Sequence, residues 1–432
     1  MRVTHLSTVD VVGGAARAAY RLHAGLRERG IDSHMFVADK RGDDRFVECC
    51  RPRSWLQTAC FRLRRRWIYR QMHHDLRNRP AWVESFSSDQ TPYNRLVPRQ
   101  IGRPDVFHLH WVAKFVDYRG ALPALACRAP LVWTLHDMNP LTGGCHYDAE
   151  CGRFNAGCGA CPQLGSSRPD DTSARIWRRK QSLFSQIPPH RLHIVTLCHW
   201  MERLVRNSPL LGRFDSSVIP NGLDTDLFTP TDRATARGEL GLPSDTMVVL
   251  FVADSTANAR KGFPLLLQAL KLLGDRRDLH LVSVGRDPPV IETNLPHSHL
   301  GLIDDEARLA KVYGAADVFV IPSLQDNLPN TVVEAMACGT PVAGFDAGGI
   351  PDMVRPGVTG ALAPTGDVAA LAAAIRGLLE NDVLRRELGG NARRVAVAEY
   401  SFALQASRFT ALYERLMQET SLPPGHAAAP RN

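Results

Sequence analysis

The chain has 432 residues, a length that predicts two domains of about 200 residues each. Hydrophobic residues make up 44% and charged residues 22%, an ordinary globular composition that excludes disorder as the default. The formal net charge is +8, with a local excess in one arginine-rich segment. No apolar run approaches the roughly 18 residues that span a bilayer, and the first residues are too polar for a signal peptide. We therefore expect a cytoplasmic protein.

The first half of the chain predicts a buried parallel sheet. It opens with a short apolar strand, Val3–Leu6, which leads through Gly13-Gly14 into a helix that continues to about Arg29. Further strands are expected at Ser33–Val37, Val106–Leu109, Leu131–Leu135 and His193–Leu197. Their apolar character is typical of parallel strands covered on both faces. Residues 40–100 are rich in arginine and proline and predict an insertion with a helix of its own.

A turn at Pro220-Asn221-Gly222 marks the expected domain boundary, beyond which strands alternate with helices. The expected strands are Met247–Val252, His280–Val284, Val318–Ile321 and Pro341–Phe345. The expected helices are Gly262–Leu273, Asp305–Tyr313, a short one ending near Cys338, Val368–Leu379, Leu384–Glu399 and Phe402–Met417. This alternation predicts a doubly wound parallel sheet.

The most informative segment runs from Asp326 to Glu334 and continues into Ala-Met-Ala-Cys-Gly-Thr-Pro-Val. Asp326 lies in a polar loop after an apolar strand, and Glu334 lies eight residues later in a short helix. Strand, loop and helix thus bring carboxylates and helix N-terminal amides to one edge of a sheet, where open α/β folds bind ligands. Carboxylates accept hydrogen bonds from sugar hydroxyls and helix amides hold phosphate, so the segment favours a nucleotide sugar.

This segment resembles the signature of the retaining glycosyltransferases of family 4, which carry Glu at the position of Asp326. The resemblance implies an α/β GT-B fold, with two Rossmann-like doubly wound parallel-sheet domains facing a central cleft. We expect an acceptor-side domain at 1–221 with a cysteine-rich loop at 143–165, and a nucleotide-sugar-binding domain at 222–400. A helix at 401–419 would pack back on the first domain, and the Pro- and Ala-rich tail at 420–432 is expected to be disordered.

The resemblance assigns catalytic roles in the second half of the chain. It implies that Glu334 binds the ribose hydroxyls and that Asp326 contacts the donor sugar. Arg260 and Lys261 precede a helix, where two cations would stabilise a diphosphate leaving group. The family usually has an arginine at the position of Thr256, and we expect the adjacent Arg260 to substitute for it. The plainer alternative is a set of surface acids and a basic helix cap.

In the first half, His136 ends a strand, and the resemblance implies that it lies against the donor sugar as a further catalytic residue. The Gly13-Gly14 loop is implied to lie near the donor phosphates and the acceptor. His108 and His110 alternate at another strand end, and we expect at most one of them to face the cleft. The expected nucleotide-sugar-binding residues are Gly13, Gly14, Arg260, Lys261, Ile303, Asn327, Leu328, Asn330, Thr331 and Glu334.

Four of the ten cysteines fall within 17 residues and are separated by glycines: Cys145, Cys151, Cys158 and Cys161. The last two form Cys-x-x-Cys, which can hold a metal with both thiolates, and His146 is a spare ligand. The spacing favours a structural zinc site that pins a loop beside His136. Reduced free thiols or two disulfides are the alternatives.

Two further patterns concern partners and metals. Five arginines between Arg62 and Arg70 alternate with aromatic and apolar residues, which suits either an anionic membrane surface or a solvated helix face. Asp224-Thr225-Asp226 matches a metal-binding tripeptide of other glycosyltransferases, but it follows the boundary turn and is interpreted as structural. We therefore expect transfer without a divalent metal.

Together these patterns predict a retaining glycosyltransferase that moves a sugar from a UDP- or GDP-sugar to a saccharide acceptor, lipid-linked at the inner face of the cytoplasmic membrane. The resemblance is to bacterial exopolysaccharide or colanic-acid-type enzymes, with no cofactor required beyond the donor and no nucleic-acid partner. The alternatives are another GT-B enzyme such as a nucleotide-sugar epimerase, a catalytically inactive scaffold, and a protein that binds nucleic acid through its arginines and cysteines. The paired carboxylates argue against the last.

Overall fold

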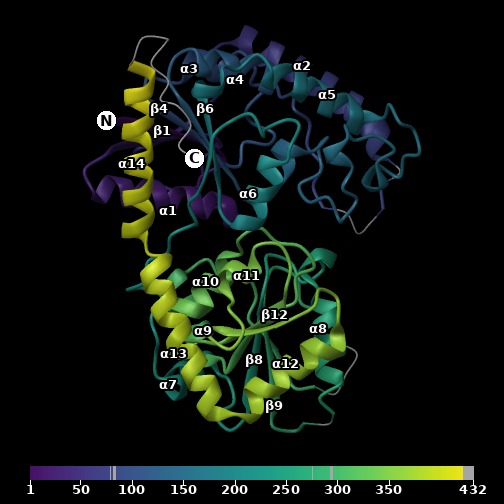
Figure 1. Cartoon of the computed structure of the whole chain (residues 1–432), viewed down its shortest axis with the longest axis vertical. Helices are drawn as coiled ribbons and strands as arrows, with labels where there is room; N and C mark the ends of the chain where they lie inside the picture. Colours follow the sequence, from purple (N-terminus) through teal and green to yellow (C-terminus); the bar gives the residue numbers. More distant parts are fainter. Residues whose placement is uncertain (78, 81–83, 275, 292–294, 422–432) are drawn as a thin grey trace. The chain divides into compact units, whose positions relative to one another are not determined.

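The computed structural model describes residues 1–77, 79–80, 84–274, 276–291 and 295–421 (Figure 1). It separates into two compact units, the first formed by Met1–Pro220 with the chain from Gln405 onward, and the second by Asn221–Leu404. The tail expected to be disordered lies, from residue 422 on, outside the described residues. No helix in the described part of the chain is both long and apolar enough to cross a membrane.

The first unit is built on a parallel sheet with strand order β3-β2-β1-β4-β5-β6-β7. The strands are β1 (Arg2–Val9), β2 (Asp32–Asp39), β3 (Val47–Cys49), β4 (Val106–Leu109), β5 (Leu131–Leu135), β6 (Leu192–Thr196) and β7 (Ser216–Val218). The helices are α1 (Gly14–Glu28), α2 (Trp55–Leu76), α3 (Leu96–Gln100), α4 (Tyr118–Ala126), α5 (Thr172–Phe184) and α6 (His199–Arg206). The insertion expected at 40–100 contains α2, which is its longest helix.

The last helix, α14 (Phe402–Ser421), is part of the core of the first unit over most of its length. Phe409 and Tyr413 of α14 pack with Leu22 and Leu26 of α1 against Val106 of β4, so the two helices cover the same face of the sheet (Figure 1). Two neighbouring aromatic rings, Tyr118 of α4 and Phe184 of α5, pack against Trp133 of β5.

The second unit has a parallel sheet with strand order β10-β9-β8-β11-β12-β13. The strands are β8 (Met247–Val252), β9 (Leu279–Val284), β10 (His297–His299), β11 (Val318–Ile321), β12 (Val342–Phe345) and β13 (Gly360–Ala363). The helices are α7 (Arg233–Leu240), α8 (Phe263–Lys271), α9 (Glu306–Ala315), α10 (Asn330–Ala337), α11 (Ile350–Met353), α12 (Val368–Glu380) and α13 (Asp382–Glu399). Because each sheet runs outward in two directions from a central pair of strands, the predicted doubly wound architecture is confirmed.

The strand order of each sheet reverses at one place, between β1 and β4 in the first unit and between β8 and β11 in the second. At such a reversal the loops that follow the two strands diverge and leave a crevice at the carboxyl edge, where α/β folds bind ligands. In the second unit the loops that follow β8 and β11 carry Lys261 and Asp326. The topology therefore brings together two residues that are 65 positions apart.

Four strands were not predicted from the sequence: β3, β7, β10 and β13. Each stands at an edge of its sheet. Edge strands are paired on one side only and are less completely covered, so they do not need the continuous apolar runs that mark the central strands. β10, with the sequence His-Ser-His, illustrates this, because its residues are only partly buried.

Candidate active site

Lys261 and Asp326 form a close ion pair at the strand-order reversal of the second sheet. Lys261 ends a single 3₁₀ turn, η5 (Ala259–Lys261), and its Nζ lies 2.6 Å from Oδ2 of Asp326. Nη1 of Arg260 lies 3.4 Å from the same oxygen and donates a 2.5 Å hydrogen bond to the carbonyl of Gln325. The structure thus brings together three of the five predicted catalytic residues.

Gly262 allows the two loops to approach this closely. It adopts a φ of +71°, and a Cβ there would lie 1.8 Å from the carbonyl oxygen of Pro322. Any other residue would push the β8 loop away from the β11 loop. The site therefore requires both residues of the Lys261-Gly262 pair. Glycine allows the β8 loop to contact the β11 loop, and lysine provides the positive charge.

The Asp326 side chain is only 7% exposed. Burial alone would raise the pKa of this carboxyl. The charges of Lys261 and Arg260, with the hydrogen bond from Lys261, outweigh that effect and hold the pKa of Asp326 below its ordinary value. The site thus contains an ionised carboxylate paired with two cations at the strand-order reversal of the second sheet. Such cations can exchange a carboxylate partner for a phosphate partner.

Glu334 lies within α10 and is buried, with its orientation fixed by a residue that the sequence analysis did not identify. The hydroxyl of Tyr313, a fully buried residue of α9, donates a 2.9 Å hydrogen bond to Oε2 of Glu334. Tyr313 appears in the sequence as the last apolar residue of a helix, and nothing in its local pattern indicates a polar partner 21 residues away. The bond orients the carboxylate that was predicted to bind a ribose.

The other predicted nucleotide-binding residues of the second unit lie along the same edge. Asn327 and Leu328 are buried in the β11 loop, while Asn330 and Thr331 begin α10 and are partly exposed. The amide of Asn221 donates to Oδ1 of Asn330 at 3.0 Å and ties the boundary turn to the start of α10. Ile303 is buried in the loop between β10 and α9. At the position where the family usually has arginine, Thr256 is buried and donates to the Asp287 carbonyl.

In the first unit, Gly13 is the N-cap of α1, and Gly14 is its first residue. Gly13 has a φ of +90° with no atom within 4 Å of an added Cβ, so the backbone conformation rather than crowding requires glycine there. The loop follows β1, which is one of the two strands at the reversal of this sheet.

His136 follows β5 and is linked to a row of buried histidine rings. Its Nε2 lies 3.2 Å from Nδ1 of His110, whose Nε2 lies 2.9 Å from Nδ1 of His5. Burial lowers the pKa of His136 to about 4, although the Asp137 charge opposes the shift. The ring is therefore neutral at pH 7 and offers a hydrogen bond rather than a positive charge.

His108 and His110 are both buried, and their ring centroids are 4.0 Å apart. The two residues are two positions apart and point to the same face. The expectation that at most one of them faces the cleft stays a prediction. His5, His108 and His110 have ring nitrogens within 4.8 Å of one another, a spacing that a metal site would also show. Both nitrogens of His108 are already hydrogen-bonded, to Tyr413 and Thr134, which favours a hydrogen-bond network.

Asp137 anchors the chain immediately after His136 and was not predicted as part of the site. Its carboxylate accepts hydrogen bonds from His146 Nδ1 at 2.5 Å, from Trp111 Nε1 at 2.6 Å and from the backbone N–H of Asn139 at 2.8 Å. Burial alone would raise the pKa of Asp137, but the charge of His146 and these bonds outweigh burial and lower it. Only the tertiary structure reveals this cluster, since its members come from separate loops.

The remaining predicted features have the following positions. The four clustered cysteines line one pocket of the first unit and are free thiols. Asp224 accepts hydrogen bonds from the backbone N–H groups of Asp226 and Leu227, which is the geometry of a turn rather than of a metal site.

The sequence matches the family described as Glycosyltransferase Family 4 over residues 12–227, half of the chain. It also matches the family described as Glycosyl transferases group 1 over residues 246–381. The chain therefore belongs to glycosyltransferase family 4.

Two curated relatives are similar to part of this chain. The D-inositol 3-phosphate glycosyltransferase of Geodermatophilus obscurus is 37% identical over 222 residues, which are 47% of this chain and 48% of that protein. The MMP alpha-(1->4)-mannosyltransferase of Mycolicibacterium hassiacum is 34% identical over 209 residues, which are 46% of this chain and 48% of that protein. The chain thus spans about half the length of the curated relatives it matches.

Solved structures share the fold over nearly the whole chain. A sucrose-phosphate synthase from Thermosynechococcus elongatus aligns with a TM-score of 0.66 and 20% identity, covering 97% of this chain and 99% of that one. HepE of Anabaena, solved with UDP and glucose, aligns with a TM-score of 0.65 and 17% identity, covering 96% and 100%. These likenesses establish the GT-B fold of this chain.

Proposed function

We propose that the protein transfers a sugar from a nucleoside-diphosphate sugar to a hydroxyl acceptor, with retention of the anomeric configuration. The observation that supports this most is the ion-paired cluster of Arg260, Lys261 and Asp326 at the strand-order reversal of the second sheet. It supplies cations for a diphosphate and a carboxylate for a sugar in one place.

In the proposed reaction the bond between the sugar C1 and the diphosphate oxygen breaks, and a bond from C1 to the acceptor oxygen forms. Lys261 and Arg260 stabilise the negative charge that develops on the leaving diphosphate. The proton of the acceptor hydroxyl passes to that diphosphate, so no enzyme base is needed. Asp326 contacts the donor sugar, and Glu334 holds the ribose hydroxyls in the orientation that Tyr313 sets.

His136 is proposed to contact the donor sugar as a neutral ring. Because its pKa lies at about 4, it neither adds a positive charge nor acts as a strong acid at pH 7. Its Nε2 faces His110, which leaves Nδ1 as the nitrogen available for other partners. The role is therefore to orient a hydroxyl rather than to transfer a proton.

A thermal-shift screen tests the donor proposal, because a ligand that binds only the folded state raises the melting temperature. The ligands are UDP, GDP, ADP and TDP with their sugars, and UDP comes first because HepE, which has the same fold, was solved with UDP and glucose. Glu334→Gln is the best site variant, since an amide still contacts Tyr313. We expect one nucleotide family to stabilise the wild type and not this variant. If no nucleotide raises the melting temperature of the wild-type protein, the proposal is contradicted.

For the acceptor, we propose a saccharide carried on a lipid in cell-surface or exopolysaccharide synthesis, with the protein held at an anionic membrane. Helix α2 supports this proposal, because five large apolar residues of α2 are exposed beside its arginines: Trp55, Leu56, Leu63, Trp67 and Tyr69. Arg64 differs from its neighbours, since it bonds to the Thr91 carbonyl and to Asp117 and attaches α2 to the rest of the first unit.

Co-sedimentation with vesicles tests the membrane contact. We expect binding to vesicles with anionic lipid, little binding to neutral vesicles, and loss of binding in Trp67→Ser with Arg66→Ser. The matched control is Val290→Ser with Arg286→Ser, which removes an exposed apolar residue and an exposed arginine from the second unit. Equal loss in the two double variants would contradict a specific role for α2.

A phosphorylated polyol is the rival acceptor, and it is favoured by the relatives named D-inositol 3-phosphate glycosyltransferase. Assays of the purified protein with the donor found in the thermal screen would compare a lipid-linked saccharide with D-inositol 3-phosphate. Transfer to the inositol phosphate alone would replace the lipid-linked acceptor. The anomeric configuration of either product, followed by nuclear magnetic resonance, tests retention.

A further inference from the structure

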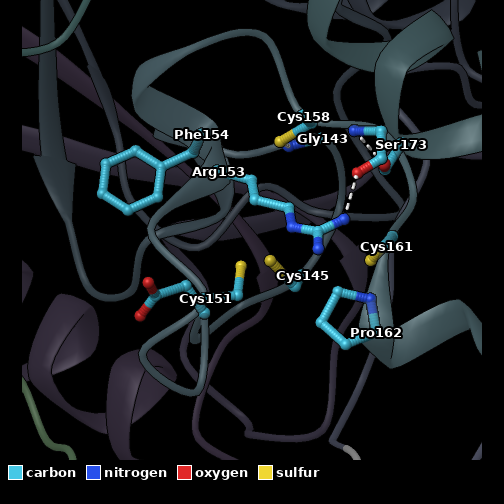
Figure 2. Close-up of a pocket in the computed structure, with 11 residues that line it drawn as sticks. Gly143, Cys145, Cys151, Arg153, Phe154, Cys158, Cys161, Pro162 and Ser173 are labelled. Carbon is cyan, nitrogen blue, oxygen red and sulfur yellow. Dashed lines mark hydrogen bonds between the residues drawn. The ribbon is translucent and has the colours of Figure 1, made fainter. Parts of the chain in front are cut away.

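The four clustered cysteines surround a single pocket in the first unit (Figure 2). They belong to the loop between β5 and α5, and the structure places them at separate points around the pocket although the loop contains little regular structure: Cys145, Cys151, Cys158 and Cys161. Cys145 and Cys161 are buried, and the other two are partly buried. The loop therefore turns its thiols inward together, which a set of unrelated thiols has no reason to do.

A backbone hydrogen bond reaches one of the four sulfur atoms directly. The backbone N–H of Gly143 donates to Sγ of Cys158 at 3.2 Å. The hydroxyl of Thr142 donates to the backbone carbonyl of Cys145 at 2.6 Å and fixes the chain at that ligand. The backbone N–H groups of Leu164 and Ser166 both donate to the backbone carbonyl of Cys161 at 3.1 Å. The donor aimed at the Cys158 sulfur favours its thiolate form, which is the form that binds metal.

Two cations accompany the thiols. Arg153 lines the pocket, and its guanidinium bonds to the carbonyls of Gly159 and Ala160, so that it lies among the four cysteines (Figure 2). Lys180 of α5 is fully buried and donates to the carbonyls of Asn139 and Thr142 at 2.5 and 2.9 Å. A tetrahedral centre of one zinc ion and four thiolates carries a net charge of −2, which these two cations would balance.

The backbone of the loop is held in an unfavourable conformation. Of the non-glycine residues with positive φ in the described chain, four fall between residues 149 and 160: Ala149, Glu150, Cys158 and Ala160. Each such residue costs on the order of 1 kcal/mol, and the conformation persists only where surrounding interactions fix it. A single centre that binds four points of the loop would supply that constraint.

We propose that this pocket is a structural zinc site with Cys145, Cys151, Cys158 and Cys161 as its ligands. Thiolates select zinc or an iron–sulfur cluster, and four of them fill the tetrahedral coordination of structural zinc. No three of these sulfurs lie within 4.8 Å of one another in the described structure, whereas zinc–sulfur bonds of about 2.3 Å need sulfurs nearly 4 Å apart. Zinc binding would therefore draw the four thiols inward.

The zinc site would stabilise the backbone that follows β5, because hydrogen bonds connect the cysteine loop to that backbone. The loop carries His146, whose ring bonds to Asp137, and the Gly144 carbonyl accepts from the amide of Asn139. Asp137 adjoins His136. Zinc would thus hold in place the backbone that positions His136, without contacting any reacting group.

The first experiment measures metal content in full-length protein purified without chelators. The working parent is Cys60→Ser with Cys127→Ser, which removes the two exposed thiols outside the loop and should leave metal content unchanged. We expect one equivalent of zinc and no iron in the parent, and a loss of at least fivefold in Cys158→Ser. The matched control is Cys50→Ser, a buried thiol outside the loop, which should retain the zinc.

A second experiment keeps all four loop cysteines, so its result does not depend on whether a cysteine variant folds. Titration of the native parent with a mercurial reagent should release the zinc as four thiols react, and chelation should open residues 143–161 to protease. Less than half an equivalent of zinc, iron in its place, or two disulfides in non-reducing mass spectrometry would each overturn the proposal. None of these readouts depends on glycosyl transfer.

Discussion

Replacing Lys261 and Asp326 separately should change the affinity for a nucleoside diphosphate in opposite directions. In the free protein Lys261 Nζ lies 2.6 Å from the Asp326 carboxylate, so a diphosphate must compete with that carboxylate for the cation. At an effective dielectric constant of about 20 the gross attraction of such a pair is about 6 kcal/mol. Most of this is offset by desolvation, because the two side chains are only 22% and 7% exposed.

For Lys261→Met we expect the loss of one charged hydrogen bond to the diphosphate, worth about 1.5 to 3 kcal/mol, which is roughly 10- to 100-fold in Kd. The variant should also unfold more easily by about 1 to 3 kcal/mol, since Asp326 keeps Arg260 as its remaining cationic partner. For Asp326→Asn we expect diphosphate binding to tighten by about 3-fold, because the competing charge is gone. Transfer should nevertheless fall by at least about 100-fold.

Isothermal titration with the diphosphate identified by thermal shift measures both affinities, and urea unfolding measures stability. Lys271→Met is the matched control, because this exposed lysine ends α8 and should leave binding unchanged. The reasoning is refuted if Lys261→Met binds as tightly as the control. Equal weakening in the Lys261 and Asp326 variants would show instead that the pair only shapes the loops.

Three other outcomes are expected. Tyr313→Phe should weaken nucleotide binding by about 5- to 10-fold, although Glu334 is unchanged, because the hydrogen bond that orients Glu334 is lost. Calorimetric titration with the nucleotide measures this change. Unchanged affinity would show that Tyr313 has no role in nucleotide binding. Gly262→Ala should lower the free energy of urea unfolding by at least about 2 kcal/mol more than Gly274→Ala does. Both positions have positive φ, but an added Cβ would clash only at Gly262. Equal losses of stability in the two variants would contradict the clash. Three histidines of the first unit have pKa values lowered by burial to about 4: His23, His136 and His193. Since the unfolded rings accept protons first, stability should hold above about pH 6.5 and fall by roughly 1 kcal/mol per pH unit for each ring down to about pH 4. A constant urea midpoint from pH 7 to pH 5 would oppose this.

Four central strands, β4, β5, β8 and β11, begin and end in the structure at the residues that the apolar runs predicted. A central parallel strand is covered by helices on both faces, so its whole length must be apolar and its limits appear in the sequence. The four edge strands were missed because pairing, not composition, makes them strands. Their identity depends on a neighbour that is distant in the chain.

In the candidate site, too, some features could be predicted from the local sequence and others depend on contacts between distant segments. Asp326, Glu334 and the Lys261-Gly262 pair stood out in the sequence because each has an unusual local context. The hydrogen bond from Tyr313 and the cluster around Asp137 did not, since each joins side chains from separate loops or helices. Local patterns identify chemical groups, whereas contacts between distant segments decide how those groups are oriented.

The sequence by itself determined that the chain forms two doubly wound α/β units, because hydrophobic period and turn residues act within a few residues of each other. It also indicated which loops carry charged groups. Only the tertiary structure decided that the loops of β8 and β11 meet, that a carboxylate neutralises the Lys261 charge there, and that four cysteines of one loop face a common pocket. Ion pairs and inward-facing thiols depend on distances in space, and those distances are fixed only when strands far apart in the chain pair in one sheet.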